Sequence, residues 1–433
     1  MSKLGTTGRL MALLAALAIF VGGARDASAQ PAPRQLSDNC ALNGICDGTD
    51  GVAGYPIRIT QPGSYVLISN LPVQGPNGGI IIALANGAVP NAVSIDLGGF
   101  TITPVAQFDT GCVFGGPPPA LGGGFNGIGI EAPPANAPPA VRIRNGTVRG
   151  FGATAISFGG ATALIEDMYV CGNFTGVTAG AGSVIRDCQI QQHVGTGVSI
   201  LTSLPNPPPT STIIEDNIIS GSGVHCLQLN GGGATIRNNV LTLCTSDGIH
   251  TANPANPTVL PPDMLIIENN VTNNGGRGIV VGAGSNVMNN IVNMNGGDGI
   301  VVGPASRVYG NVIDTNGGTG LNMGVTAIAR DVNRTSWGNN VISDNGTAVS
   351  PTIANSIGVG TVCPMPSGGV MGAPTGSVFA FGNTGGNVIN GAVISPSSCC
   401  GNGIAEGNED CDDGNGTPAD GCENNCQIST TGP

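Results

Sequence analysis

The chain of 433 residues carries 14 lysine and arginine residues against 26 aspartate and glutamate residues, a formal net charge of −12 at pH 7. Nucleic acids and anionic membranes are recognised by basic patches, so this balance argues against both as partners. Only 3% of residues are aromatic and 9% are charged, whereas glycine occurs 73 times. A core of large side chains is therefore excluded, and closely spaced turns are expected.

Residues 1–29 have the features of a Sec signal peptide. Lys3 and Arg9 form a basic region, residues 10–23 form an apolar run, and Ala27-Ser28-Ala29 supplies the small residues of a cleavage site. We expect cleavage after Ala29 and therefore a secreted protein, extracellular or at the cell surface. No later segment has the ~20 unbroken apolar residues of a membrane helix, so membrane insertion is not expected.

Residues 30–54 are predicted to cap the N-terminal end of the following solenoid, whose first strand would otherwise present an open edge. Cys40 and Cys46 lie in this segment and are predicted to form a local disulfide. Thirteen cysteines in all are typical of an oxidising compartment. The odd number leaves at least one thiol unpaired or paired between molecules.

Residues 55–345 contain an internal repeat of about 21 residues. An apolar position recurs at Ile143, Ile165, Ile185, Ile214, Ile236, Ile267, Val287 and Val308. Two intervals are longer than the others because they contain the Pro-rich insertions 204–210 and 253–263. A further short strand follows a glycine in most repeats, as at Gly248-Ile249 and Gly278-Ile279. Three short strands per repeat without a helical period predict one turn of a β-helix.

Stacking these turns, about 4.8 Å apart, predicts two further columns. One is an asparagine ladder in which side-chain amides bond to their neighbours above and below, formed by Asn217, Asn239, Asn270, Asn290, Asn311 and Asn340. The other alternates strictly in sign along Arg144, Glu166, Arg186, Glu215, Arg237 and Glu268. We interpret the charged column as setting the register on a solvent face, with little stability from each exposed pair.

Residues 62–67 (Pro62-Gly63-Ser64-Tyr65-Val66-Leu67), 93–102 and 143–151 resemble the opening turns of right-handed parallel β-helix proteins of the pectate-lyase-like superfamily. The resemblance covers roughly residues 55–345. It implies an all-β fold, a right-handed parallel β-helix solenoid. The superfamily includes lyases, hydrolases, epimerases, phage tailspikes and non-catalytic surface proteins, so the resemblance implies no single activity.

Residues 346–398 are predicted to form irregular last turns and a linker, and residues 399–428 a small disulfide-rich C-terminal module. Cys400, Cys411, Cys422 and Cys426, spaced by glycine, asparagine and aspartate, resemble the short cysteine-rich repeat of extracellular proteins of myxobacteria and related organisms. Two disulfides are expected there, with the pairing open. Oxygen ligands for Ca²⁺ are offered by Asp412, Asp413, Asn415 and Asp420, solvated acidic turns being the alternative. No other cofactor is expected.

Candidate catalytic residues fall in two columns beside the glycine-led strand. The residue before this glycine is, in successive turns, Thr175, Thr196, His225, Asp247, Arg277, Asp298 and Thr319. Two positions after it stand Thr178, Ser199, Gln228, His250, Val280, Val301 and Asn322. We expect the polar members to share one face, with the Pro-rich insertions beside it as walls. Gln228 and Asn322 are the predicted substrate contacts.

This face offers two kinds of chemistry. A polysaccharide lyase needs a group that neutralises the uronate carboxylate, here Arg277 or a Ca²⁺ held by Asp247 and Asp298, and a base for the C5 proton, here His250 or His225. A glycoside hydrolase would instead use Asp247 and Asp298, about 9–10 Å apart over two turns, which would favour inversion. The alternative is a mixed-charge ladder without catalysis.

The leading functional hypothesis is therefore a secreted protein that binds, and by elimination or hydrolysis cleaves, an extracellular polysaccharide. The alternative is a non-catalytic protein of the cell surface or matrix, with a structural or adhesive role and a cell-surface component as partner. Sugar sites often stack rings on tryptophan, and Trp337 is the only one in the chain, which favours the alternative. The gathered histidine, aspartate and arginine residues favour the polysaccharide.

Overall fold

The computed structural model describes residues 32–74, 78–84, 92–105, 112, 126–130, 140–159, 161–201, 212–231, 233–252, 263–303, 305–323, 336–350, 382–383, 387–389 and 392–394. The chain divides into a segment Met1–Pro33 and a unit Arg34–Pro433, to which all strands described below belong. The predicted signal peptide, the Pro-rich insertions except Asp263, and the cysteine-rich segment 399–428 with its four oxygen ligands lie outside the described residues.

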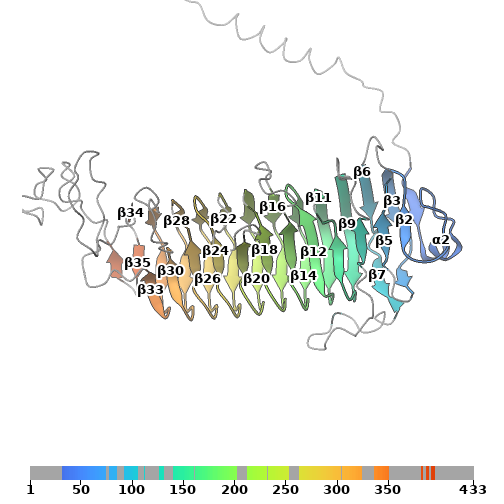
Figure 1. The fold of residues 1–433 in the computed structure, drawn as a ribbon. Helices are drawn as coiled ribbons and strands as arrows, with labels where there is room; N and C mark the ends of the chain where they lie inside the picture. The colour runs from blue at the N-terminus through green and yellow to red at the C-terminus, as the bar shows by residue number, and fades with distance from the viewer. Residues whose placement is uncertain are drawn as a thin grey trace, which may run out of the picture. The chain divides into compact units, whose positions relative to one another are not determined.

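Most turns of the chain, here called rungs, consist of three short strands (Figure 1). A representative rung contains β25 (Asn286–Met288), β26 (Ile291–Asn293) and β27 (Ile300–Val302). Each strand pairs in parallel with its counterpart in the next rung: β28 (Arg307–Tyr309), β29 (Val312–Asp314) and β30 (Thr319–Asn322). The first two strands of the rungs build a 24-stranded sheet, called sheet A, and the third strands a 12-stranded sheet, called sheet B. The predicted right-handed parallel β-helix is confirmed.

Sheet A also contains β1 (Arg34–Leu36), β3 (Gly63–Leu67), β4 (Leu71–Val73), β6 (Ala92–Asp96), β7 (Thr101–Pro104), β9 (Ala140–Arg149), β11 (Ala163–Cys171), β13 (Val184–Arg186), β14 (Gln189–Gln191), β16 (Thr212–Glu215), β17 (Ile218–Ser220), β19 (Ala234–Arg237), β20 (Val240–Thr242), β22 (Leu265–Ile267), β23 (Asn270–Thr272), β31 (Ser336–Gly338), β32 (Val341–Ser343), β34 (Gly382–Asn383), β35 (Asn387–Ile389) and β36 (Ala392–Ile394). Sheet B also contains β2 (Ile57–Ile59), β5 (Ile80–Ile82), β8 (Ile128–Ile130), β10 (Thr154–Ser157), β12 (Thr175–Gly180), β15 (Val198–Leu201), β18 (Leu227–Asn230), β21 (Ile249–Ala252), β24 (Ile279–Val281) and β33 (Thr347–Ser350).

The core is a stack of aliphatic side chains, one set per rung. In the representative rung Val287, Val292 and Ile300 each have 0% of their surface exposed. Side chains alternate between the two faces of a strand, so three strands of three or four residues bury a small apolar set inside each rung. This arrangement needs few aromatic residues, in agreement with the composition.

An asparagine ladder lines one turn between the two strands of sheet A. The Oδ1 of Asn290 accepts hydrogen bonds from the backbone N–H and the Nδ2 of the preceding ladder residue, at 2.9 and 3.0 Å. Its own Nδ2 donates to the carbonyl oxygens of Ile266 and Met288. The ladder consists of Asn217, Asn239, Asn269, Asn290, Asn311, Asn340 and Asn387. All four bonding positions of the inner ladder amides, from Asn239 to Asn340, are thereby used, which satisfies polar groups that would otherwise be costly to bury.

The structure corrects one rung of this pattern. Ile266, not Ile267, pairs with Ile236 in the core column, and Asn269, not Asn270, is the ladder residue. Glu268 accordingly lies at a turn position with φ of 59°, which Asn238 and Asn289 occupy in the neighbouring rungs. The doublet Asn269-Asn270 allows two alignments of this rung with its neighbours. The alignment that placed Glu268 in the charged column was predicted, and it is wrong.

The predicted charged column is confirmed from Arg144 to Arg237. It begins one rung earlier than predicted, at Asp96. Arg144 lies 2.9 Å from Asp96, Arg186 lies 2.7 Å from Glu166, and the Nε of Arg237 donates to Glu215 at 2.7 Å. Backbone pairing places Asp96, Arg144, Glu166, Arg186, Glu215 and Arg237 in register. The alternation ends where Ile267 pairs with Arg237.

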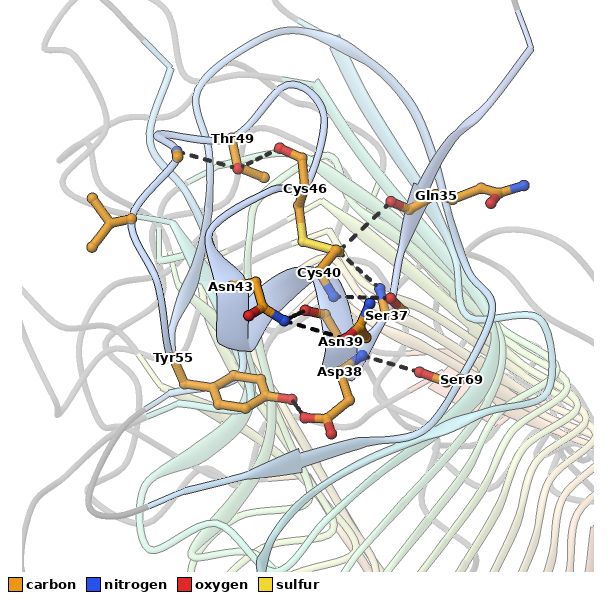
Figure 2. The surroundings of a disulfide bond; sticks show 12 residues. Gln35, Ser37, Asp38, Asn39, Cys40, Asn43, Cys46, Thr49, Tyr55 and Ser69 are labelled. Atoms are coloured by element: carbon orange, nitrogen blue, oxygen red, sulfur yellow. Dashed lines mark hydrogen bonds between the residues drawn. A yellow bond between two sulfur atoms is a disulfide. The ribbon is translucent and has the colours of Figure 1, made fainter.

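The N-terminal end carries the short helix α2 (Asp38–Asn43), shown with its surroundings in Figure 2. Ser37 caps the helix by accepting the N–H of Cys40 at 3.1 Å. The predicted disulfide between Cys40 and Cys46 is present, and Tyr55 donates to Asp38 at 2.7 Å. These bonds fix the segment that precedes the first complete rung. Within the described residues, no helix is long and apolar enough to span a membrane.

Candidate functional site

The predicted columns beside sheet B are in the predicted register. Backbone bonds join Cys226 to Asp247, Gly248 to Arg277 and Gly278 to Asp298, so His225, Asp247, Arg277 and Asp298 occupy successive rungs. In the adjoining column Gln228, His250 and Val280 are paired. Glycine leads most of these strands because the chain passes close to the next rung there. A Cβ on Gly248 would lie 3.0 Å from the side-chain amide of Asn274.

Three residues converge on the carboxylate of Asp247, and together with it they are called the Asp247 cluster: His225, His250 and Arg277. The Oδ1 of Asp247 accepts the backbone N–H of Arg277 at 2.8 Å, and its Oδ2 accepts the Nη2 of Arg277 at 2.9 Å. The same Oδ2 lies 2.8 Å from the Nδ1 of His250. Only 5% of the Asp247 side chain is exposed, against 20% for His250 and 39% for Arg277. The carboxylate is thus buried beneath a histidine and an arginine that reach solvent.

The two histidines of the cluster are stacked, with ring centroids 4.2 Å apart and planes inclined by 10°. The Nδ1 of His225 accepts the backbone N–H of Asp247 at 3.3 Å, which assigns the proton of a neutral His225 to Nε2. His250 has the opposite arrangement, because a carboxylate partner requires a proton on Nδ1. The Nε2 of neutral His250 therefore keeps its lone pair and is the atom equipped to accept a proton.

The charges of the cluster are set by these contacts. Burial would raise the pKa of Asp247, but hydrogen bonds from His250 and Arg277 outweigh it and hold the pKa well below its usual range. Burial lowers the pKa of His225 to about 4, and His250 and Arg277 act in the same direction. At neutral pH the cluster therefore holds an ionised aspartate and a neutral His225.

Three other predicted site residues lie on this face but outside the cluster. Asp298 accepts the backbone N–H of Thr319 at 2.7 Å and the Nδ2 of Asn322 at 2.9 Å. Gln228 donates to Asn230 at 3.4 Å. Asp298 lies two rungs from Asp247, with Arg277 between them, and the two carboxylates have separate partners. The Ca²⁺ site shared by Asp247 and Asp298 that was considered from the sequence stays a prediction.

His225, Asp247 and His250 each place a potential metal-ligand atom within 4.8 Å of the others. The donor set is poorly suited to a cation. The Asp247 oxygen that a metal would use already receives Arg277, and the Nδ1 of His225 already accepts a backbone N–H. A guanidinium at 2.9 Å from the same carboxylate repels a second positive charge. These contacts therefore disfavour a cation at the Asp247 carboxylate.

A second ladder and a disulfide support the site from inside and were not predicted from the sequence. Asn274, Asn295, Asn316 and Asn345 form a second asparagine ladder. In the rung before Asn274 the same column contains Cys244, whose backbone N–H donates to the Oδ1 of Asn274. Cys244 is joined to Cys226, the residue after His225. Cysteine at 226, where Gly248 and Gly278 stand in the next rungs, was the signal available in the sequence.

A separate groove of about 640 Å³ crosses the first strands of sheet A, over β3, β6, β9, β11 and β13. Its lining is mainly apolar, with Val93, Val141 and Leu164 among the contributors and Arg142 as a charged side chain at its edge. The groove contains no residue of the Asp247 cluster. It therefore does not bear on the chemistry of sheet B.

The fold and the stacked columns define the class of protein, a right-handed β-helix. Two matches to the family described as "Right handed beta helix region", over residues 126–313 and 209–412, together cover more than half of the chain. The chain belongs to this family. No functionally curated protein matches it in sequence.

The chain is also similar to solved structures. A double mutant of the periplasmic alginate epimerase AlgG matches with a TM-score of 0.51 at 13% identity, over 74% of this chain and 81% of the other. The Dettilon tailspike protein gp208 gives a TM-score of 0.45 at 16% identity, over 73% and 68% of the two chains. The A-module of mannuronan C-5 epimerase AlgE6 from Azotobacter vinelandii gives 0.40 at 16% identity, over 74% and 85%. At these identities the similarity concerns the fold alone.

Proposed function

We propose that this chain is a secreted, carbohydrate-active β-helix protein that removes the C5 proton of a uronate in an extracellular polysaccharide, at the Asp247 cluster. The observation that carries the proposal is the contact of 2.8 Å between the Nδ1 of His250 and the Oδ2 of Asp247, with Arg277 bound to the same carboxylate. A buried aspartate that orients a solvent-reaching histidine is a recurrent general-base arrangement.

In this mechanism Arg277 binds the uronate carboxylate and stabilises the negative charge that develops when the C5 proton leaves. The Nε2 of His250 takes the proton, and the resulting imidazolium is stabilised by Asp247. For elimination, the electron pair of the broken C5–H bond forms a double bond between C4 and C5. The C4–O bond breaks as this double bond forms, and the leaving oxygen takes a proton from His250 or water. Return of a proton to the opposite face of C5 would instead give the epimer.

Hydrolysis through paired carboxylates has weaker support. A general acid must be protonated at working pH, whereas the contacts of Asp247 favour its ionised form. Only 5% of its side chain is exposed, which leaves little access for a glycosidic oxygen. The proton-abstraction mechanism uses Asp247 in the state that the structure favours.

A non-catalytic surface or matrix protein is the second candidate, and one observation favours it. Trp337 lies in the core column, paired with Val308 in the preceding rung and only 5% exposed. The single tryptophan is therefore buried and does not offer a stacking platform for sugar rings. A carbohydrate would have to be held by polar and charged groups alone.

The location and the domain organisation are part of the proposal. Disulfides between Cys40 and Cys46 and between Cys226 and Cys244 support an oxidising compartment, as a signal peptide at residues 1–29 would require. Residues 30–54 would cap the solenoid of residues 55–345, followed by last rungs and a linker at 346–398. The module at residues 399–428 would carry two further disulfides and bind the cell surface, or simply stabilise that end. Similarity of fold to an alginate epimerase supports a polysaccharide partner.

The test measures ultraviolet absorbance of an unsaturated uronate product over pectate, alginate and glycosaminoglycans, with and without Ca²⁺. Parallel reactions in D₂O detect exchange at C5 without cleavage. Wild type is compared with His250→Ala and with Asp314→Asn, a control on sheet A. We expect product or exchange that His250→Ala abolishes and the control retains. New reducing ends without ultraviolet absorbance or exchange at C5 would indicate hydrolysis. No product from any polymer would favour the non-catalytic surface protein.

A further inference from the structure

We infer that the substrate is a polysaccharide of low charge density, in which each uronate is flanked by uncharged sugars. This inference rests on the proposed function and names its substrate class. A glycan lying along the two columns of sheet B would meet one cationic group, at Arg277, and no second one in the neighbouring rungs. The argument follows from the charges and side chains of these rungs.

The column that contains Arg277 carries no other cation among its described members. Asp247 precedes Arg277 and binds it at 2.9 Å, and Asp298 follows one rung later. The charges of this stretch are therefore negative, positive and negative. A second carboxylate placed beside the first would lie near Asp298 and be repelled. A homopolymer of uronates presents such a carboxylate on every sugar.

The adjoining column offers no compensating group. Of the residues that follow His250 in this column, Val280 is buried and not accessible to a ligand, and Val301 is half-buried with an apolar side chain. On the other side of His250 stands Gln228, a neutral amide bonded to Asn230. These neighbours suit a sugar without a carboxylate on either side of the bound uronate.

The amino-acid sequence of the two segments that follow strands β15 and β21 supports the same conclusion. Residues 202–211 and 253–262, which follow strands β15 and β21 of sheet B, contain no lysine or arginine. The whole chain carries a net charge of −12, so long-range electrostatics also oppose the approach of a densely charged polyanion. One charged site on an otherwise neutral or acidic face selects an isolated carboxylate.

The test compares three polymers of graded charge on the full chain: hyaluronan, with a carboxylate on every second sugar, polygalacturonate, with one on every sugar, and a partly methyl-esterified pectin. At low ionic strength we expect kcat/KM for hyaluronan to exceed that for polygalacturonate about tenfold, with the esterified pectin between them. The ratio should shrink as salt is raised from about 20 to about 200 mM, because screening weakens the repulsion. Equal rates on all three polymers, or a preference for polygalacturonate, would overturn the inference.

Asp298→Asn supplies the matched variant. The Oδ1 of an asparagine at position 298 would still accept the Thr319 N–H. Its Nδ2 would donate to the Oδ1 of Asn322 once the Asn322 amide has turned over, so both local bonds survive without the charge. We expect about fivefold higher kcat/KM on polygalacturonate and less than twofold change on hyaluronan. Asp314→Asn, which removes a charge from sheet A, should change neither. If Asp298→Asn changes kcat/KM equally on both polymers, or on neither, the inference is contradicted while the proposed function stays intact.

Failure of the proposed function can be distinguished from failure of the inference about the substrate. If wild type and His250→Ala are equally inert on every polymer, the proposed function fails, and binding of the same three polymers then decides the inference. Stronger binding of polygalacturonate than of hyaluronan at low salt, or no binding of any of them, would overturn it. Stronger binding of hyaluronan, weakened selectivity in Asp298→Asn and no effect of Asp314→Asn would support it as a property of a binding protein.

Discussion

The Nδ1 of His250 and the Oδ2 of Asp247 lie 2.8 Å apart, and the two residues are three positions from each other in one short segment. The chain bends at Gly248, between the two residues, and enters strand β21 with Ile249 facing the core. The backbone N–H and guanidinium of Arg277 hold the other side of the carboxylate from the next rung. The dyad is thus fixed by its own turn and by one neighbouring rung.

Asp247→Asn should abolish the general base and the bond from the Nη2 of Arg277, while keeping the bond from the Arg277 backbone N–H. The Oδ1 of the asparagine would still accept the Arg277 N–H, but its Nδ2 would face the Nδ1 of His250 and force the His250 proton onto Nε2. The atom that should accept the substrate proton would then carry one already. We expect kcat to fall about 100-fold or more, with KM little changed. An unchanged kcat would show that Asp247 does not orient His250.

Stability should decline below neutral pH because of His193, which lies in the column of the second ladder. It is 3% exposed, its Nδ1 accepts the N–H of Asn173, and burial lowers its pKa to about 4. Between its ordinary pKa of about 6.5 and about 4, the unfolded state binds a proton that the folded state does not. The free energy of unfolding therefore falls as pH drops through this window and is fully retained above it.

His193→Asn tests this explanation, since asparagine is the residue that the column carries in the rungs from Asn274 onward. The variant should accept the Asn173 N–H and remove the proton uptake. We expect the midpoint of thermal unfolding to become less dependent on pH between about 6.5 and 4. His225 also has a lowered pKa and would leave a residual dependence. A pH profile identical to wild type would exclude His193 as its source.

The repeats made much of this architecture predictable. The columns of core residues, ladder asparagines and site residues follow from a constant number of residues per rung, so His225, Asp247 and Arg277 could be placed in successive rungs. The error at Asn270 arose where a doublet of asparagines made the register ambiguous. The partner of each carboxylate was not predictable, because Asp247 and Asp298 occupy the same column and accept the same backbone bond. Arg277 and His250 surround the first, whereas Asn322 binds the second.

The second ladder escaped prediction for a related reason. Only four successive rungs place asparagine in it, and nearer the site the column contains Cys244 and His193, which share no sequence signature. Their common role becomes apparent from backbone bonds, since Asn173 donates to His193 and Cys244 donates to Asn274. A column of mixed residue types can therefore be identified from the structure but not from composition.

The corrected register makes a direct prediction about two adjacent asparagines. Asn269 is 1% exposed, and its Oδ1 accepts two bonds from Asn239 while its Nδ2 donates to Ile236 and Ile267. Asn269→Ala would leave these buried groups unpaired and should cost about 2–4 kcal/mol of unfolding free energy. Asn270→Ala, beside the ladder, should cost less than about 1 kcal/mol. Chemical denaturation of both variants measures the difference, and the reverse order would restore the register predicted from the sequence.

The disulfide between Cys226 and Cys244 should matter more for activity than the disulfide between Cys40 and Cys46. Both close short loops, and the 18-residue separation of the first predicts a loss of about 3 kcal/mol of stability when it is removed. It also holds the residue after His225 against the rung that carries Asp247, so its loss should loosen the stacked histidines. We expect the double alanine variant at 226 and 244 to lower kcat at least about tenfold, while that at 40 and 46 retains activity. Faster amide hydrogen exchange at residues 244–250 would accompany the loss. Equal activity of the two variants at a temperature where both are folded would show that the asparagines and the charges of the cluster hold the site without the covalent link.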